Sequence, residues 1–318
     1  MKKTITILFN AFCLTAFAQQ KDFEGIMTYR VDVQSKSELI SNRAIMNMLA
    51  TGNTMTIFIK HGNYRQTSGI TDSYFISKDQ KVYLKFKGVD TLYYLDYNSD
   101  TTAVTQVSRS DEKKTIAGVE CKLLNVKLGT TTRKYFYAPS LYMNPDYDKN
   151  NTIGRYDVFA KETSSLYLGF DEENKSYSLV ENCVRMQQTA VNDSVFNLPG
   201  LPRTKFSAEE LVVKPEFARA GGWEKYAAAN LDGKVAAKYL KVPKGEQMVS
   251  QQVIVMFLVN ENGKVVSAEV INKKEVHPKL AEEALRVINE SPLWKPATFF
   301  GGKITWWVKA PITFEVTN

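Results

Sequence analysis

The sequence predicts an α+β protein, in which an antiparallel β-sheet crossed by one helix is followed by a smaller domain of helices and strands. Residues 23–196 consist mostly of short stretches where apolar and polar side chains alternate, separated by Gly, Asn, Asp and Ser. Such alternation is typical of antiparallel strands with one buried face. Residues 223–316 instead mix helical and strand patterns. The 318 residues are enough for two domains, and 44% hydrophobic residues are typical of a globular chain.

The first 18 residues have the features of a secretory signal peptide. Lys2 and Lys3 precede an apolar stretch over residues 5–17, and small residues flank Phe17 at its end. This is the pattern that signal peptidase recognises. The apolar stretch is shorter than the ~20 residues that a membrane-spanning helix needs. We therefore predict that residues 1–18 are cleaved and that the mature chain contains no membrane span.

Residues 19–200 are predicted to form the antiparallel sheet domain. We expect strands at residues 25–33, 55–60, 82–87, 123–126, 134–137 and 178–185. Residues 38–50 differ, because their apolar side chains recur at roughly helical spacing. A single amphipathic helix early in a sheet domain usually lies across the sheet.

The predicted helix is also the candidate lining of a pocket for an apolar ligand. Flexible Met side chains suit adaptable apolar pockets. The candidate lining residues are Leu39, Ile45, Met46, Met48 and Leu49. Ordinary core packing is the more common role of such residues and is the alternative.

Residues 201–216 are predicted to be a linker, and residues 217–318 a second domain. Three prolines lie between residues 199 and 215, with a glycine and several charged residues. In the second domain we expect helices at 223–231 and 278–290, and strands at 250–259, 265–271 and 304–316. Gly263 supplies the positive φ of the turn between the first two strands. The order helix–strand–strand–helix–strand predicts a small α+β domain with its helices on one sheet face.

Residues 217–318 resemble the C-terminal domain of the TonB family. The resemblance rests on a Gly-Gly pair before a helix, a strand–turn–strand core, a His-Pro helix start, and two closing elements around Trp294 and Pro311. They lie at 221–222, 252–265, 277–285, 291–303 and 310–314. The resemblance implies a non-enzymatic protein in the periplasm of a Gram-negative bacterium, without a cofactor. It also implies a protein partner, for example an outer-membrane receptor, bound by adding a strand to a sheet edge.

Residues 19–200 resemble, less specifically, secreted sheet proteins related to lipoprotein carriers, including the GLPGLI family. The similar stretches are 23–29, 116–122 and 193–199, and residues 198–202 match part of the motif that names the GLPGLI family. The resemblance implies a half-barrel, which is a strongly curved antiparallel sheet with a helix over its concave face. Such a shape can hold a lipid or another apolar ligand. A periplasmic carrier is therefore the alternative function, beside a purely structural role.

The sequence contains no pattern that indicates catalysis, metal binding or nucleic-acid binding. His61 and His277 are the two histidines, and they read as a turn residue and a helix-capping residue. No His-x-x-x-His pair, cysteine cluster, Gly-x-Ser-x-Gly or phosphate-binding glycine loop occurs. The net charge of +7 is modest for this length and includes no long basic run. We expect no catalytic residue, no metal and no nucleic-acid partner.

Two cysteines remain after residue 18, Cys121 and Cys183. In an oxidising compartment they can form one disulfide, and two separate buried thiols are the alternative. Spacing alone does not decide between them.

Three of the four tryptophans lie within residues 291–307. We predict that Trp294 is a core residue between helix and sheet. Trp306 and Trp307 are adjacent in a predicted strand, so their side chains must point to opposite faces, and one should be exposed. Pro311 lacks an N–H and therefore suits an edge strand. The candidate docking edge is Thr305, Trp306, Trp307 and Lys309.

Overall fold

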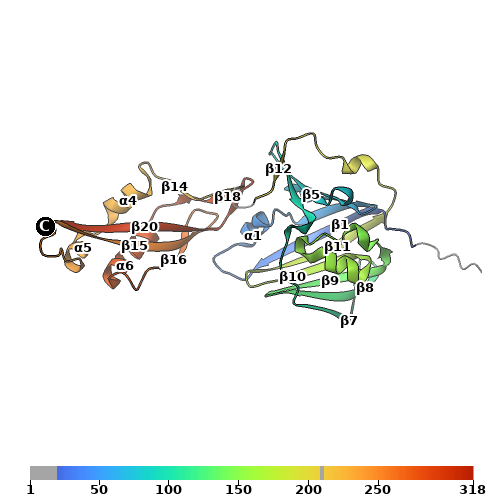
Figure 1. Ribbon diagram of the computed structural model, residues 1–318, viewed down its shortest axis with the longest axis horizontal. Coiled ribbons are helices and arrows are strands. Elements are labelled where there is room, and N and C mark those ends of the chain that lie inside the picture. The colour runs from blue at the N-terminus through green and yellow to red at the C-terminus, as the bar shows by residue number, and fades with distance from the viewer. Residues whose placement is uncertain (1–19, 208–210, 318) are drawn as a thin grey trace, which may run out of the picture.

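The computed structural model describes residues 20–207 and 211–317, so the predicted signal peptide lies outside the described residues. The chain is a mixed α+β protein built mostly from strands. Figure 1 shows two parts along its longest axis. The N-terminal part is a large open sheet, and the C-terminal part is a smaller sheet with helices on it.

The N-terminal sheet has twelve strands in the order β12-β6-β5-β4-β3-β2-β1-β11-β10-β9-β8-β7. Neighbours are antiparallel except β12 and β6, which are parallel. The strands are β1 (Gly25–Ser35), β2 (Thr54–Lys60), β3 (Asn63–Thr67), β4 (Thr71–Ile76), β5 (Lys81–Phe86), β6 (Leu92–Asp96), β7 (Gln106–Ile116), β8 (Val119–Leu128), β9 (Thr131–Tyr142), β10 (Ser165–Glu173), β11 (Tyr177–Gln188) and β12 (Arg203–Lys205). Each predicted strand overlaps one of these.

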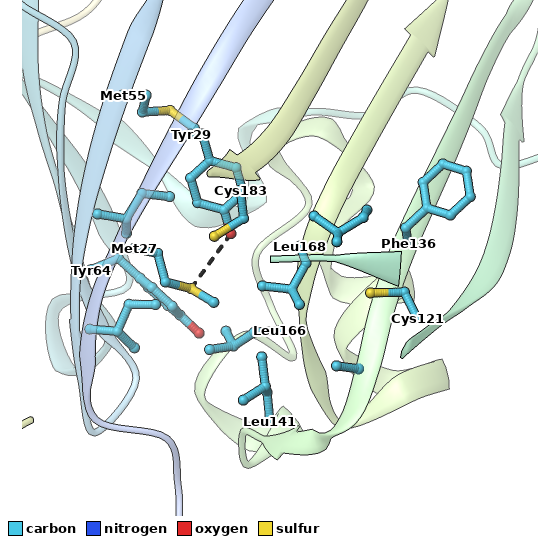
Figure 2. Close-up of a cluster of buried hydrophobic side chains, with 14 of the residues drawn as sticks. Met27, Tyr29, Met55, Tyr64, Cys121, Phe136, Leu141, Leu166, Leu168 and Cys183 are labelled. Carbon is cyan, nitrogen blue, oxygen red and sulfur yellow. Dashed lines mark hydrogen bonds between the residues drawn. The ribbon is translucent and has the colours of Figure 1, made fainter. Parts of the chain in front are cut away.

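Strand β1 shows how the alternating sequence builds the core. Its side chains alternate between buried and more exposed positions along the whole strand. Met27 and Val31 are fully buried, and Tyr29 is 1% exposed. Figure 2 shows the side chains of Met27 and Tyr29 facing those of Leu166 and Leu168 from β10. The predicted one-sided burial therefore holds for this strand.

Helices cover the N-terminal sheet at two places. The predicted helix over residues 38–50 is shorter in the structure, as α1 (Asn42–Met48), and the Ser41 side chain caps it by accepting from the Ala44 N–H. A second helix, α2 (Tyr156–Thr163), was not predicted. Its Phe159 ring stacks on Tyr135 of β9 with ring centroids 4.6 Å apart. Short 3-10 turns are η1 (Ser77–Asp79), η2 (Tyr97–Ser99), η3 (Pro145–Tyr147), η4 (Ile153–Arg155) and η5 (Asp193–Phe196).

The C-terminal part is built around a three-stranded antiparallel sheet in the order β16-β15-β20. Its elements are β13 (Val212–Val213), β14 (Glu216–Phe217), α4 (Gly222–Asn230), α5 (Gly233–Tyr239), β15 (Met248–Val259), β16 (Val265–Val270), α6 (Pro278–Asn289), β17 (Trp294–Lys295), β18 (Ala297–Phe299), β19 (Gly302–Ile304) and β20 (Trp306–Thr317). The two predicted helices and three predicted strands are all present, and α5 is additional.

The C-terminal core confirms the prediction for Trp294. This side chain is 6% exposed and packs against Phe257 of β15, with ring centroids 5.1 Å apart. Gly263 lies in the β15–β16 turn at a φ of 80°, and a Cβ there would meet the Trp294 carbonyl oxygen. The Trp294 N–H donates to the Gly263 carbonyl at 2.8 Å. The turn and the aromatic core residue are therefore fixed to each other.

The predicted linker, residues 201–216, contains strands in the structure. Strand β12 pairs with β6 of the N-terminal sheet, and β13 pairs with β18 of the C-terminal part. The Pro and Gly residues indicated an irregular segment, but sequence cannot show pairing with strands that lie far away in the chain.

The two parts contact each other through aromatic side chains. Phe300 stacks on Phe86 of β5 with ring centroids 3.4 Å apart, and Phe206 and Phe299 pack around them. The Asn47 side chain in α1 donates to the Lys303 carbonyl at 2.8 Å. Helix α1 therefore touches both the N-terminal sheet and the β18–β19 hairpin.

Cys121 and Cys183 are both buried and free. Strands β8 and β11, which carry them, are separated by β9 and β10. Three strand spacings of about 4.8 Å lie between them, whereas a disulfide needs Cα atoms within about 7 Å. Figure 2 shows the two thiols on opposite sides of Leu168. The structure therefore has two separate buried thiols in place of the possible disulfide.

Candidate functional site

Strand β20 is an edge strand of the C-terminal sheet. It pairs with β15 over its whole length, from Trp306 opposite Val259 to Thr317 opposite Met248. Among residues 20–207 and 211–317, no strand pairs with the other side of β20. Edge strands carry unpaired N–H and C=O groups that can accept a further strand.

The hydrogen bonds of Ile254 show which β20 residues have backbone groups that point to the open edge of the sheet. The Ile254 N–H donates to the Asn272 side chain at 2.9 Å, and its carbonyl accepts from the Ile271 N–H at 3.0 Å. Both bonds are on the β16 side. Pro311, the residue opposite Ile254 on β20, therefore belongs to a non-hydrogen-bonded pair, and its backbone points away from β15. By alternation, the backbone groups of Lys309 and Thr313 also point to the open edge.

The four candidate docking residues lie at different depths. Trp307 is 47% exposed and Lys309 is exposed, on the sheet face away from the buried Ala310 and Ile312. Trp306 is part-buried and packs against the Phe299 cluster. Thr305 is buried, and its hydroxyl donates to Glu261 at 3.1 Å. The two tryptophans thus occupy opposite faces, with one exposed.

A cavity of about 470 Å³ lies on the inner face of the N-terminal sheet. Residues from β1, β2, β3, β4, β9, β10 and β11 line it, so the sheet curves around it. The loop before α2 contributes Asp148 and Asn151, and α2 contributes Tyr156. Volumes of this size are usual for small-molecule sites.

Tyrosines form much of the cavity wall. They are Tyr29, Tyr64, Tyr135, Tyr156 and Tyr167. The Tyr29 hydroxyl donates to the Tyr167 carbonyl at 2.7 Å, which fixes the ring of Tyr29 between β1 and β10. Apolar side chains, including Met27, Ile57 and Ile59, complete the wall.

Charged groups also line the cavity. Arg133 donates to Glu172 at 2.7 Å, and the Tyr177 hydroxyl donates to the other oxygen of Glu172 at 2.8 Å. Asp148 accepts from the Tyr64 hydroxyl at 3.1 Å and from Asn151 at 3.0 Å. Glu181 accepts from the Tyr167 hydroxyl at the long distance of 3.4 Å. Glu172 is thus well paired, whereas Glu181 is not.

Burial makes the two remaining carboxyl groups difficult to ionise. It raises the pKa of Glu181 to about 7, opposed by the Tyr167 hydrogen bond. It raises the pKa of Asp148 to about 6, opposed by the hydrogen bonds from Asn151 and Tyr64. A carboxylate in such surroundings gains from any cation placed next to it.

The predicted lining residues reach the cavity only at the end of the helix. Leu49, just after α1, lines the cavity. Ile45 belongs to the buried core of the N-terminal part, and Met46 packs against this core. Leu39 and Met48 are 39% and 48% exposed. Because α1 is short and presents one narrow face to the sheet, the other four residues lie outside the cavity lining.

Residues 247–316 match the family model described as Gram-negative bacterial TonB protein C-terminal. These residues form a TonB C-terminal domain. The match includes β15, β16, α6 and all of β20 except Thr317, and therefore nearly the whole three-stranded sheet with its open edge. TonB C-terminal domains bind proteins and are not enzymes, and the TonB family belongs to the Gram-negative cell envelope.

Other comparisons add little beyond the TonB C-terminal domain. No curated protein matches the chain. A crystal structure of PNGF-II is similar at 12% identity and a TM-score of 0.37, covering 76% of this chain and 45% of that one. An uncharacterised conserved protein from Thermus thermophilus is similar at 8% identity and a TM-score of 0.30, and the similarity covers 56% of this chain and 90% of that one. The chain thus spans less than half the length of the PNGF-II structure.

Sequence reasoning missed the charged cavity residues, although one indication was present. Glu181 lies two residues from both Leu179 and Cys183, so strand alternation places it on their buried face. A carboxylate at an inward strand position is unusual and could have been noticed. Asp148 and Asn151 come from an irregular loop whose sequence gives no such indication.

Within the described ranges, no helix is both long and apolar enough to cross a membrane. No group of three or more His, Cys, Asp or Glu side chains suited to hold a metal occurs in the same residues. His277 accepts from the Lys279 N–H at 3.2 Å and caps α6, as predicted.

Proposed function

We propose that this protein is a non-enzymatic periplasmic adaptor whose TonB C-terminal domain docks a protein partner by strand addition to β20. The partner class is an outer-membrane receptor. The observation that carries the proposal is the open edge of β20, where outward backbone groups lie beside the exposed Trp307. In strand addition, main-chain hydrogen bonds supply affinity and neighbouring side chains supply specificity.

Fluorescence anisotropy with extended peptides tests this function. The peptides are taken from the periplasmic N-terminal segments of outer-membrane receptors of the same organism. We expect Trp307→Ala to weaken binding by about tenfold or more, because exposed aromatic anchors dominate interface energies. Its effect on thermal stability should be small.

Trp306→Ala is the matched control, since it removes the same side chain from the opposite face of the strand. It should lower the melting temperature, because Trp306 packs against the Phe299 cluster. Equal binding of the peptides by wild type and Trp307→Ala would count against docking at this face.

A second candidate function is supported by the cavity. The N-terminal sheet would act as a periplasmic carrier that holds a lipid or another largely apolar small molecule. The volume of about 470 Å³ and the apolar part of the wall favour this role. Native mass spectrometry of the purified protein tests it, because a retained small molecule adds a defined mass. A ligand-free protein that still binds receptor peptides would favour the adaptor alone.

A further inference from the structure

We propose that the cavity of the N-terminal sheet binds an organic cation, an alkylammonium compound whose charged group lies among Glu181, Asp148 and the surrounding tyrosines. The alkyl part would contact Met27, Ile57 and Ile59. This inference rests on the second proposed function, that the cavity holds a ligand. It specifies the chemical class of that ligand.

The balance of charge in the cavity favours a cation. Three carboxyl groups line it, from Asp148, Glu172 and Glu181, and Arg133 is the one basic side chain among the described lining residues. Arg133 and Glu172 form an ion pair at 2.7 Å, with 18% and 9% of their side chains exposed. Asp148 and Glu181 have no basic partner in the wall. The carboxylate of a fatty acid would be repelled by them, whereas an ammonium group would be attracted.

Hydrogen-bond acceptors in the cavity are also short of donors. Asn151 is 3% exposed, and its side-chain oxygen is a buried acceptor without a hydrogen-bond partner among the residues that the structure describes. Within the same described residues, Glu181 accepts one hydrogen bond, from the Tyr167 hydroxyl at 3.4 Å. Burying an acceptor without a donor costs about 1–3 kcal/mol, and an unpaired carboxylate costs more. A ligand with several N–H groups, such as a primary ammonium, supplies what these residues lack.

The tyrosine wall suits a cation for a second reason. Tyr167 lies 5.7 Å from Tyr29, 5.9 Å from Tyr135 and 6.5 Å from Tyr156 between ring centroids. Each of the three rings is tilted or edge-on to the Tyr167 ring, so these four tyrosines of the cavity wall do not stack in one column. Aromatic faces attract cations by about 0.5–2 kcal/mol each, most strongly where water is excluded.

Calorimetric titration at pH 8 with three ligands of equal chain length tests the inference. The probes are octylammonium, octan-1-ol and octanoate, added to the full chain. Octylammonium should bind about tenfold or more tightly than octan-1-ol, which corresponds to about 1.4 kcal/mol. Octanoate should bind most weakly.

Two carboxylate variants separate the cavity from general charge. Glu181→Gln should weaken octylammonium binding by about tenfold and leave octan-1-ol binding unchanged. Glu173→Gln is the matched control, because Glu173 is next in the sequence to the cavity residue Glu172 but its side chain is 69% exposed. It should bind octylammonium like the wild type. Asp148→Asn provides a second cavity variant if Glu181→Gln does not fold.

The outcomes are distinct. If octan-1-ol and octanoate bind as tightly as octylammonium, the cavity holds apolar ligands and the cation inference is overturned. If none of the three binds, the second proposed function fails with it. If Glu173→Gln weakens octylammonium binding as much as Glu181→Gln, the effect is general electrostatics and the assigned site is wrong.

Discussion

Glu181 illustrates how a single inward side chain can make the stability of the protein depend on pH. The carboxyl group faces the Tyr167 hydroxyl and Glu172, and no basic side chain within residues 20–207 and 211–317 hydrogen-bonds to it. Burial raises the pKa of Glu181 from the ordinary 4.5 to about 7. Folding therefore favours the protonated form. This contribution to stability is fully present below about pH 4.5 and is lost as the pH rises through about 7.

We predict that Glu181→Gln stabilises the ligand-free protein by on the order of 3 kcal/mol at pH 8 and by less than about 1 kcal/mol at pH 5. The amide is neutral at both pH values, so it avoids the cost of a buried carboxylate. Chemical denaturation at the two pH values measures the difference. A gain of equal size at both pH values would show that ionisation is not the cause.

Trp294 is predicted to contribute strongly to the stability of the C-terminal core. Trp294→Ala should lower the free energy of unfolding by about 3–5 kcal/mol, because it leaves a cavity beside Phe257. Leu293→Ala is the adjacent control, since Leu293 is 55% exposed. Urea denaturation followed by circular dichroism compares them, and similar losses would contradict a core role for Trp294.

Residue-level predictions from sequence were good where strand alternation or a motif applied. The burial of Trp294 and the opposite faces of Trp306 and Trp307 followed from such patterns. The polar groups of the cavity could not be predicted in this way, because Asp148 and Asn151 reach the cavity from a loop whose course depends on the tertiary fold.

At the scale of elements, β20 contains two alternating sets of residues, one bonded to β15 and one with its backbone groups at the open edge. Ile312 is buried, and by alternation its backbone points to β15. Thr313 is exposed, and its backbone points to the open edge. The same strand therefore closes the core on one side and offers hydrogen bonds on the other.

We predict that Thr313→Pro abolishes peptide binding with little loss of stability. It removes one outward N–H and places a ring at the edge, where proline is tolerated. Ile312→Pro should instead destabilise the domain, because it removes a hydrogen bond to β15 and a core side chain. Thr313→Val keeps the N–H and should bind normally. Peptide anisotropy and thermal melts measure both effects, and normal binding by Thr313→Pro would rule out strand addition at this edge.

Some elements were predictable because they are strongly amphipathic, and others were missed because no alternation marks them. Helix α6 has one apolar face and was found near its observed bounds. Strand β7 was missed because nearly all of its side chains are exposed or part-buried, so no alternation marks it. Strand β12 was missed because its three residues are exposed and it is defined by its parallel pairing with β6.

At the scale of the whole molecule, the aromatic contact between Phe86 and Phe300 holds the two parts together. Phe300 adopts a φ of 47°, which is unusual for a residue with a side chain, and its ring stacks on Phe86. The stacking stabilises the arrangement against this strain.

We predict that Phe300→Ala loosens the segment that joins the two parts. Trypsin should then cleave after Arg203 or Lys205 several-fold faster, because local opening exposes β12 to the protease. Leu293→Ala, which removes an exposed apolar side chain of the C-terminal part, should leave the rate unchanged. Gel analysis with mass mapping measures the cleavage, and an unchanged rate in Phe300→Ala would show that the stacking does not hold β12.

Two strand pairings differ in length, so we expect them to separate in a fixed order when the chain is pulled. A partner strand pulling along β20 would load the twelve-residue ladder with β15 in shear, where all its hydrogen bonds resist together. The three-residue pairing of β12 with β6 has far fewer bonds and lies at the outer edge of the large sheet. Under tension β12 would detach first, while β1 and β11, which border the cavity, remain paired along their lengths. The pairing of β12 with β6 would thus break before the strands around the cavity separate.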